Sequence, residues 1–125
     1  DNMTSVQACV KGIKSNVPDD GFNMAVIYDS EEVGSGTKQG AGSVIIRNII
    51  DRIFRKFGYD EETAECALAD AVGLSVDVAH GIHPNIPEKN DPTNKLLLNH
   101  GFGIKTSAGE RYASDPVVIG IVKGL

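Results

Sequence analysis

The chain has only two cysteines and no long hydrophobic run. Each of these features excludes some classes of protein. Its 125 residues include two cysteines, Cys9 and Cys66, which lie far apart and form no CxxC pair. Reduced, structural thiols are the better interpretation of such a pattern, and we therefore predict a cytoplasmic protein. No apolar run approaches the roughly 20 residues that span a bilayer, so we expect no membrane segment.

An excess of positive charge is also absent. The chain carries 12 Lys and Arg against 17 Asp and Glu, a formal net charge of -5. Nucleic acids and anionic membranes attract basic surfaces, so neither is expected as the main partner. What remains is the composition of a soluble globular protein, 41% hydrophobic and 23% charged, with enough length for a single core.

Apolar periodicity predicts helices that alternate with buried strands. Helical spacing marks four segments: one that starts at Asp1 or Asn2 and includes Ile13, then 43–57, 61–72, and one that starts at Ser114. Near-continuous apolar runs predict strands at 21–29, 73–80 and 102–107. Ser43 and Ser114 are expected to cap two of the helices, and Gly58 to end one. The alternation predicts an α/β layered fold with a mostly parallel sheet.

Two adjacent acids, Glu31 and Glu32, stand where the first predicted strand runs into a glycine-rich loop. Neighbouring residues of extended chain point to opposite sides. One glutamate could therefore hold a metal while the other faces a reacting water. Sites in such sheets form at the carboxyl ends of strands, where both glutamates and Asp77 are expected to fall.

The segment VDVAHGIHP, residues 76–84, adds a third acid and two histidines. Asp77 sits inside an apolar strand, where a bare carboxylate is costly unless it is paired or bound to metal. With Asp1, His80 and His83, the acids could supply the carboxylates and imidazoles that a pair of divalent metals needs. Each also has an ordinary interpretation: Asp77 satisfied by backbone donors, His80 in the core, and the two glutamates on the rim of a turn.

The glycine-rich loop does not match a phosphate-binding motif. GSGTKQGAG has neither the GxGxxG spacing nor the GxxxxGK[ST] signature. Gly34, Gly36, Gly40 and Gly42 are instead expected to let the backbone pass close to a site and to supply conformational freedom at the turn.

Four segments together resemble one known family. They are DNMTSVQA, DSEEVGSGTKQGAGS, SVDVAHGIHPNIPEKNDP and GFGIKTSAGERYASD, which begin at residues 1, 29, 75 and 101. In this order they resemble the aspartyl aminopeptidase and aminopeptidase I family of dinuclear zinc exopeptidases, from Asp1 to about Asp115. The resemblance implies a three-layer α/β/α sandwich with a mostly parallel sheet. It also implies a metal-dependent aminopeptidase that hydrolyses the N-terminal residue of peptides.

The resemblance assigns roles to the acids. Asp1 matches the aspartate that bridges two divalent ions, most often zinc, although cobalt or manganese also suits such ligands. Glu32 and Asp77 match further metal ligands. Glu31 matches the general base that acts on a metal-activated water. Of the adjacent glutamates, Glu32 would thus bind metal and Glu31 would act on the water.

Four further residues match substrate-lining positions of the family: His80, His83, Lys105 and Tyr112. The lysine could pair with an acidic side chain at the N-terminus of a peptide, which would favour substrates that begin with Asp or Glu. Large homo-oligomers are also expected from the family.

The departures from the family pattern predict an incomplete site. Two more histidine ligands and an inserted dimerisation domain have no counterpart in this sequence, which begins without Met and stops inside VVIGIVKGL. We therefore expect residues 1–125 to be one segment of a catalytic domain, inactive by itself. Two alternatives remain: a non-catalytic assembly or binding module that keeps the peptidase fold, and a related deacylase of N-acyl amino acids.

Overall fold

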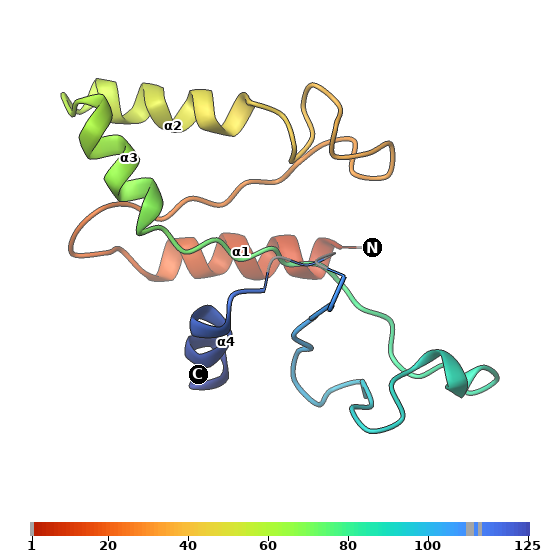
Figure 1. Ribbon diagram of the computed structural model, residues 1–125. Coiled ribbons are helices and arrows are strands. Elements are labelled where there is room, and N and C mark those ends of the chain that lie inside the picture. Colours follow the sequence, from red (N-terminus) through yellow and green to blue (C-terminus); the bar gives the residue numbers. More distant parts are fainter. Residues whose placement is uncertain (1, 110–111, 113) are drawn as a thin grey trace. The chain divides into compact units, whose positions relative to one another are not determined.

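A computed structural model describes residues 2–109, 112 and 114–125, which fall into two compact units. The first unit extends to Ser75 and contains three helices: α1 (Met3–Ser15), α2 (Ile45–Lys56) and α3 (Glu61–Ala69). The second unit begins at Val76 and contains a short 3-10 helix, η1 (Pro87–Lys89), and α4 (Pro116–Lys123). Figure 1 follows these elements along the chain.

Helix α3 forms where the sequence predicts a helix, because its start signals are strong and local. The carboxylate of Asp60 accepts a hydrogen bond from the Thr63 amide at 2.8 Å and so caps the first turn. Hydrogen bonds from Thr63 lower the pKa of Asp60. Glu61 and Glu62 follow in the first turn, where negative charge favours the helix dipole. The helix ends at Ala69, three residues before the predicted end.

Helix α2 ends as its sequence predicts. Gly58 follows with φ of +83°, a left-handed conformation that glycine adopts without cost, and its amide donates to the Arg55 carbonyl at 3.1 Å. At the other end, Val44 and not Ser43 holds the N-cap position. The Ser43 hydroxyl accepts a long 3.4 Å hydrogen bond from the Ile45 amide, so that prediction is wrong by one residue.

The predicted cap of the last helix is also displaced by one residue. Asp115, directly before Pro116, accepts hydrogen bonds from the Val117 and Val118 amides at 2.8 and 3.2 Å. Ser114 lies too early to reach these amides, and its hydroxyl donates instead to the Lys105 carbonyl at 2.6 Å. Proline at the first helical position fixes where the helix begins.

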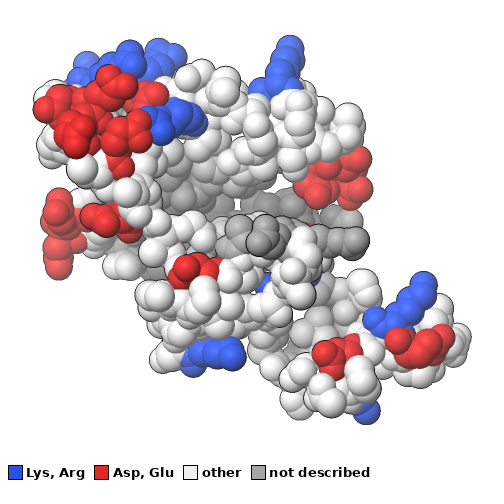
Figure 2. Space-filling model, viewed as in Figure 1, with Lys and Arg blue, Asp and Glu red and all other residues white. Residues whose placement is uncertain are grey.

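Aromatic side chains pack together in the first unit. The ring of Phe54, on α2, lies 6.0 Å from that of Phe22 and 5.8 Å from that of Tyr59, measured between centroids. These contacts join α2 to chain segments on both sides of it in sequence. Helices α2 and α3 pack against each other, and acidic and basic side chains intermix over them in Figure 2.

The three segments predicted as strands carry no strand in the part of the chain that the structure describes. Residues 22–28, 71–80 and 102–107 run without regular secondary structure. A strand requires a neighbour that pairs with its backbone groups. The three-layer sandwich around a parallel sheet therefore stays a prediction.

Few side chains are buried. Ala64, on α3, is the buried apolar side chain of the described residues, while large apolar side chains such as Leu98 and Phe102 are 80% and 70% exposed. Cys9 and Cys66 are free thiols. Among the helices of the described ranges, none combines the length and apolarity needed to cross a bilayer.

Candidate active site

The adjacent glutamates lie in a turn and not at the end of extended chain. The Gly34 amide donates to the Ser30 carbonyl at 3.0 Å, which closes one helical turn around Glu31 and Glu32. Successive residues of such a turn point about 100° apart, since a helix has about 3.6 residues per turn. The alternation expected of extended chain is therefore wrong here. Both glutamates are exposed.

Ser30 sets the entry to this turn. Its φ of +62° places it in the left-handed region, which is uncommon for residues other than glycine. The Asp29 carboxylate accepts a hydrogen bond from the Ser30 amide at 2.8 Å. The Ser30 hydroxyl accepts another from the side-chain amide of Gln39 at 3.2 Å. All three polar groups of Ser30 are thus engaged, which holds the backbone in an unusual conformation.

The glycine-rich loop closes tightly on itself. The Gly42 amide donates to the Ser35 carbonyl at 2.9 Å, and the Gly40 amide to the Thr37 carbonyl at 3.1 Å. A Cβ atom on Gly40 would lie 2.5 Å from the Ser35 carbonyl oxygen, so this position has no room for a side chain. Gly34 has φ of +134°, and its freedom is used in the turn that holds the glutamates.

The second unit contains the other acid that was expected at the site. Asp77 is exposed, so the cost of burying a carboxylate does not apply to it in this structure. Its carboxylate accepts a hydrogen bond from the Val78 amide at 2.7 Å. His80 and His83 are exposed too, and Nδ1 of His83 accepts a hydrogen bond from the Asn85 amide at 3.2 Å. The alternative interpretation of His80 as a core histidine is therefore wrong.

Two of the predicted substrate residues are neighbours. The Lys105 ammonium group lies over the ring of Tyr112, 5.6 Å from its centroid, within the range of a cation–π contact. The Ser114 hydroxyl donates to the Lys105 carbonyl, which ties the backbone at Lys105 to the start of α4. Both Lys105 and Tyr112 are exposed and so accessible to a ligand.

The residues that the structure describes do not assemble a metal centre by themselves. Glu31 and Glu32 belong to the first unit, whereas Asp77 and both histidines belong to the second. Asp1 lies outside the described residues. Within residues 2–109, 112 and 114–125, no three His, Cys, Asp or Glu side chains gather closely enough to hold a metal ion. Carboxylates are ordinary ligands of zinc, so the chemistry of Glu32 and Asp77 fits the ligand roles that the resemblance implies.

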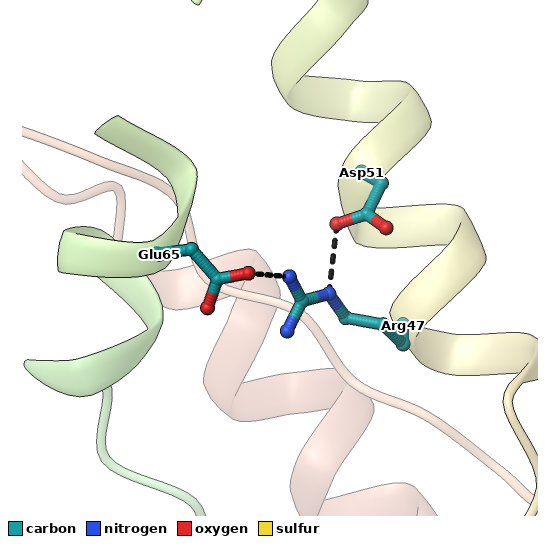
Figure 3. A network of polar contacts seen from close by, with 3 residues as sticks. All are labelled: Arg47, Asp51 and Glu65. Atoms are coloured by element: carbon teal, nitrogen blue, oxygen red, sulfur yellow. Dashed lines mark hydrogen bonds and ion pairs between the residues drawn. The ribbon is translucent and has the colours of Figure 1, made fainter. Parts of the chain in front are cut away.

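Sequence reasoning missed a polar network between α2 and α3. Arg47 donates from Nε to Asp51 at 2.9 Å and from its terminal amino group to Glu65 (Figure 3). The hydrogen bonds to Glu65 and Asp51 raise the pKa of Arg47. The spacing of Arg47 and Asp51, four residues apart on one helix, could have signalled that contact. No local signal indicates Glu65, which is 18 residues away.

The contact between Ser30 and Gln39 was also missed. Nothing in the eight intervening residues predicts it, because it depends on the way the glycine-rich loop folds back. Serine is not among the residues most enriched at positive φ, so the left-handed conformation of Ser30 has no sequence signal either.

Comparison with known proteins places the chain in a family. Residues 1–125 match the family described as aminopeptidase I zinc metalloprotease (M18), and the chain belongs to that family. The resemblance seen in its motifs is thereby confirmed. No solved structure matches the chain.

Its relatives carry related names. The chain is 39% identical over 125 residues to a probable M18 family aminopeptidase 2 of Clostridium novyi, a match that covers all of this chain and 29% of the relative. It is 35% identical over 97 residues to a probable aspartyl aminopeptidase of Ricinus communis, which covers 78% of this chain and 20% of the relative. The chain thus spans less than a third of the length of these relatives.

Proposed function

We propose that this chain is a segment of the catalytic domain of a metal-dependent aminopeptidase that removes the N-terminal residue of peptides. The observation that carries the proposal is the match of all 125 residues to the zinc metalloprotease family. The conformation of the chain adds support, because the glutamate pair is exposed and held in a closed turn. A site that acts on a substrate needs side chains that are both accessible and fixed in direction.

We assign distinct roles to the acids. Glu31 serves as general base, which takes a proton from the attacking water and later passes one to the leaving amine. Asp1, Glu32 and Asp77 serve as ligands of two divalent ions, for which zinc is the preferred metal. Since the described residues do not complete such a site, parts of the whole protein that this sequence does not contain supply the remaining ligands.

Lys105 is proposed to select acidic N-terminal residues. Its ammonium group is exposed and lies over the Tyr112 ring, so the side chain has a defined direction while its charge stays accessible. A carboxylate at the N-terminal residue of a peptide would form a charge-assisted hydrogen bond with it. The name of the Ricinus relative, a probable aspartyl aminopeptidase, agrees with this preference. His80 and His83 are proposed as further substrate contacts.

The test is release of the N-terminal residue from Asp-, Glu- and Leu-peptides by the whole protein, with and without a chelator. We expect release that a chelator abolishes and added zinc restores, and faster release of Asp and Glu than of Leu. Release of leucine alone would keep the aminopeptidase and remove the role of Lys105. No release of any residue with zinc supplied would leave a non-catalytic module.

The variant Glu31→Gln separates the base from the ligands. It keeps the size of the side chain and removes its ability to accept a proton at pH 7, so turnover should fall by a factor of at least about 100, the lower end of what general-base catalysis contributes. Zinc content, measured by metal analysis, should stay unchanged. Glu61→Gln, at the exposed start of α3, is the matched control and should retain full activity. Loss of zinc along with turnover in Glu31→Gln would instead make Glu31 a ligand.

A further inference from the structure

The link between Ser30 and Gln39 points to a role that lies beyond the glutamates themselves. The side-chain amide of Gln39 donates to the Ser30 hydroxyl at 3.2 Å and so links the glycine-rich loop to the residue before the glutamate pair. Both residues are partly buried, whereas Glu31 and Glu32 are exposed. We propose that Gln39 is a positioning residue, which fixes the direction of the glutamate pair by holding Ser30 in its left-handed conformation.

Rotation at Ser30 controls where the glutamates point. Its φ of +62° is sparsely populated for a residue with a side chain, so the conformation persists only if surrounding contacts hold it. Asp29 holds the amide of Ser30, and Gly34 holds its carbonyl. Both contacts come from residues within four positions of Ser30, which would move with it. Gln39 supplies the contact to the Ser30 side chain from outside the turn.

Gln39 is suited to this role because it lies inside a turn that backbone hydrogen bonds of its neighbours close. The Gly40 amide donates to Thr37, the Ser43 amide donates to Gly40 at 3.0 Å, and Gly40 has no room for a Cβ atom. The loop therefore presents the Gln39 side chain from a rigid base. The loop leads into α2, which begins at Ile45. The contact between Gln39 and Ser30 thus holds the glutamate pair in a fixed direction relative to α2.

The consequence for the reaction rests on the proposed function. A general base must lie within hydrogen-bond reach of the proton that it takes, and small displacements of a catalytic group lower the rate strongly. Loosening of the turn should therefore lower kcat more than it raises KM, because substrate contacts in the second unit are untouched.

The experiment uses four variants of the whole protein: Gln39→Met, which keeps the length of the side chain and removes the donor, Ser30→Ala, the double variant, and Lys38→Ala as an exposed neighbouring control. With zinc in excess, we expect each single variant to lower kcat about tenfold with KM within a factor of about two. The double variant should be no worse than either single one, because both remove the same contact. Lys38→Ala should match the wild type.

Additive losses in the double variant, or a kcat that stays at the wild-type value in Gln39→Met, would overturn the proposal. A merely structural role would lower the melting temperature and leave kcat per folded molecule unchanged, which would overturn it too.

A second readout does not depend on activity. Amide hydrogen exchange at Gly34 reports whether its hydrogen bond to the Ser30 carbonyl is kept. We expect faster exchange at Gly34 in Gln39→Met and no change in Lys38→Ala. If the wild type releases no N-terminal residue, the proposed function fails while exchange at Gly34 still decides the role of Gln39. Unchanged exchange would overturn it.

Discussion

At the scale of single residues, three hydrogen-bond donors surround the carboxylate of Asp91. Its carboxylate accepts hydrogen bonds from the Asn94 amide at 2.9 Å and from the amide and hydroxyl of Thr93 at 2.8 and 2.7 Å. These donors stabilise the charged form and lower the pKa of Asp91 from 3.8 to about 2. An aspartate that bonds to the backbone two and three residues later forms a turn of its own, which closes the chain after Pro92.

The depressed pKa of Asp91 gives a pH dependence with a defined sign. A carboxyl group whose pKa is lowered in the folded protein stabilises the folded turn at pH values above its ordinary pKa of 3.8. That contribution is lost as the pH falls toward about 2. Carbon NMR of the Asp91 carboxyl group in the whole protein should show its inflection near pH 2. In Thr93→Val, which removes the hydroxyl donor, the inflection should move upward. An Asp91 inflection near 4 in the wild type would contradict these contacts.

The residues of the candidate site divide into those that sequence can find and those that it cannot. The sequence identifies Glu31 and Glu32 as candidates because two adjacent acids precede a glycine-rich loop. It does not predict their geometry, since the turn depends on the backbone of Ser30 and on Gln39, which is nine residues from Ser30. Contacts across a loop are set by how the loop folds, and no periodicity encodes them.

At the scale of elements, local signals predicted the helices well. The Asp60 cap and the Gly58 stop act within a few residues, so helix bounds near them follow from sequence. The predicted strands do not follow in this way. A strand takes its backbone partners from elsewhere in the sequence, and the described residues show no such pairing for residues 22–28.

The packing of α2 on α3 gives a prediction about salt. Arg47 contacts both Asp51 and Glu65, and all three side chains retain contact with solvent. Arg47→Lys keeps the charge but loses the planar group that reaches two carboxylates at once. We expect a small drop in the melting temperature of the whole protein at low salt, measured by calorimetry, because exposed ion pairs contribute little. The difference from wild type should shrink as salt is added.

The matched control for Arg47 is Arg52→Lys, on the same helix. Arg52 appears in neither ion pair of this network. Its replacement should leave the melting temperature at the wild-type value at every salt concentration. An equal drop in both variants would mean that the loss of arginine as such, and not the contact with Glu65, lowers stability.

At the scale of the whole molecule, the chain exposes more apolar surface than a stable domain usually leaves uncovered. Phe57 and Val33 are 73% and 80% exposed, and so are many of the large apolar side chains that the structure describes. Monomeric proteins rarely leave contiguous apolar patches open unless something binds them. The chain spans 29% of the Clostridium novyi relative, and we propose that the rest of a catalytic domain covers these side chains.

This proposal predicts a sharp difference between residues 1–125 alone and the whole protein. Alone, the chain should bind a dye that fluoresces on exposed apolar surface, unfold without a cooperative heat-capacity peak, and release no residue from Asp-peptides with zinc supplied. A cooperative transition requires a core, and Ala64 is the buried apolar side chain that the described residues provide. The whole protein should unfold cooperatively and bind little dye. A cooperative transition for residues 1–125 would mean that the segment is a domain in its own right, and that its apolar side chains serve another partner.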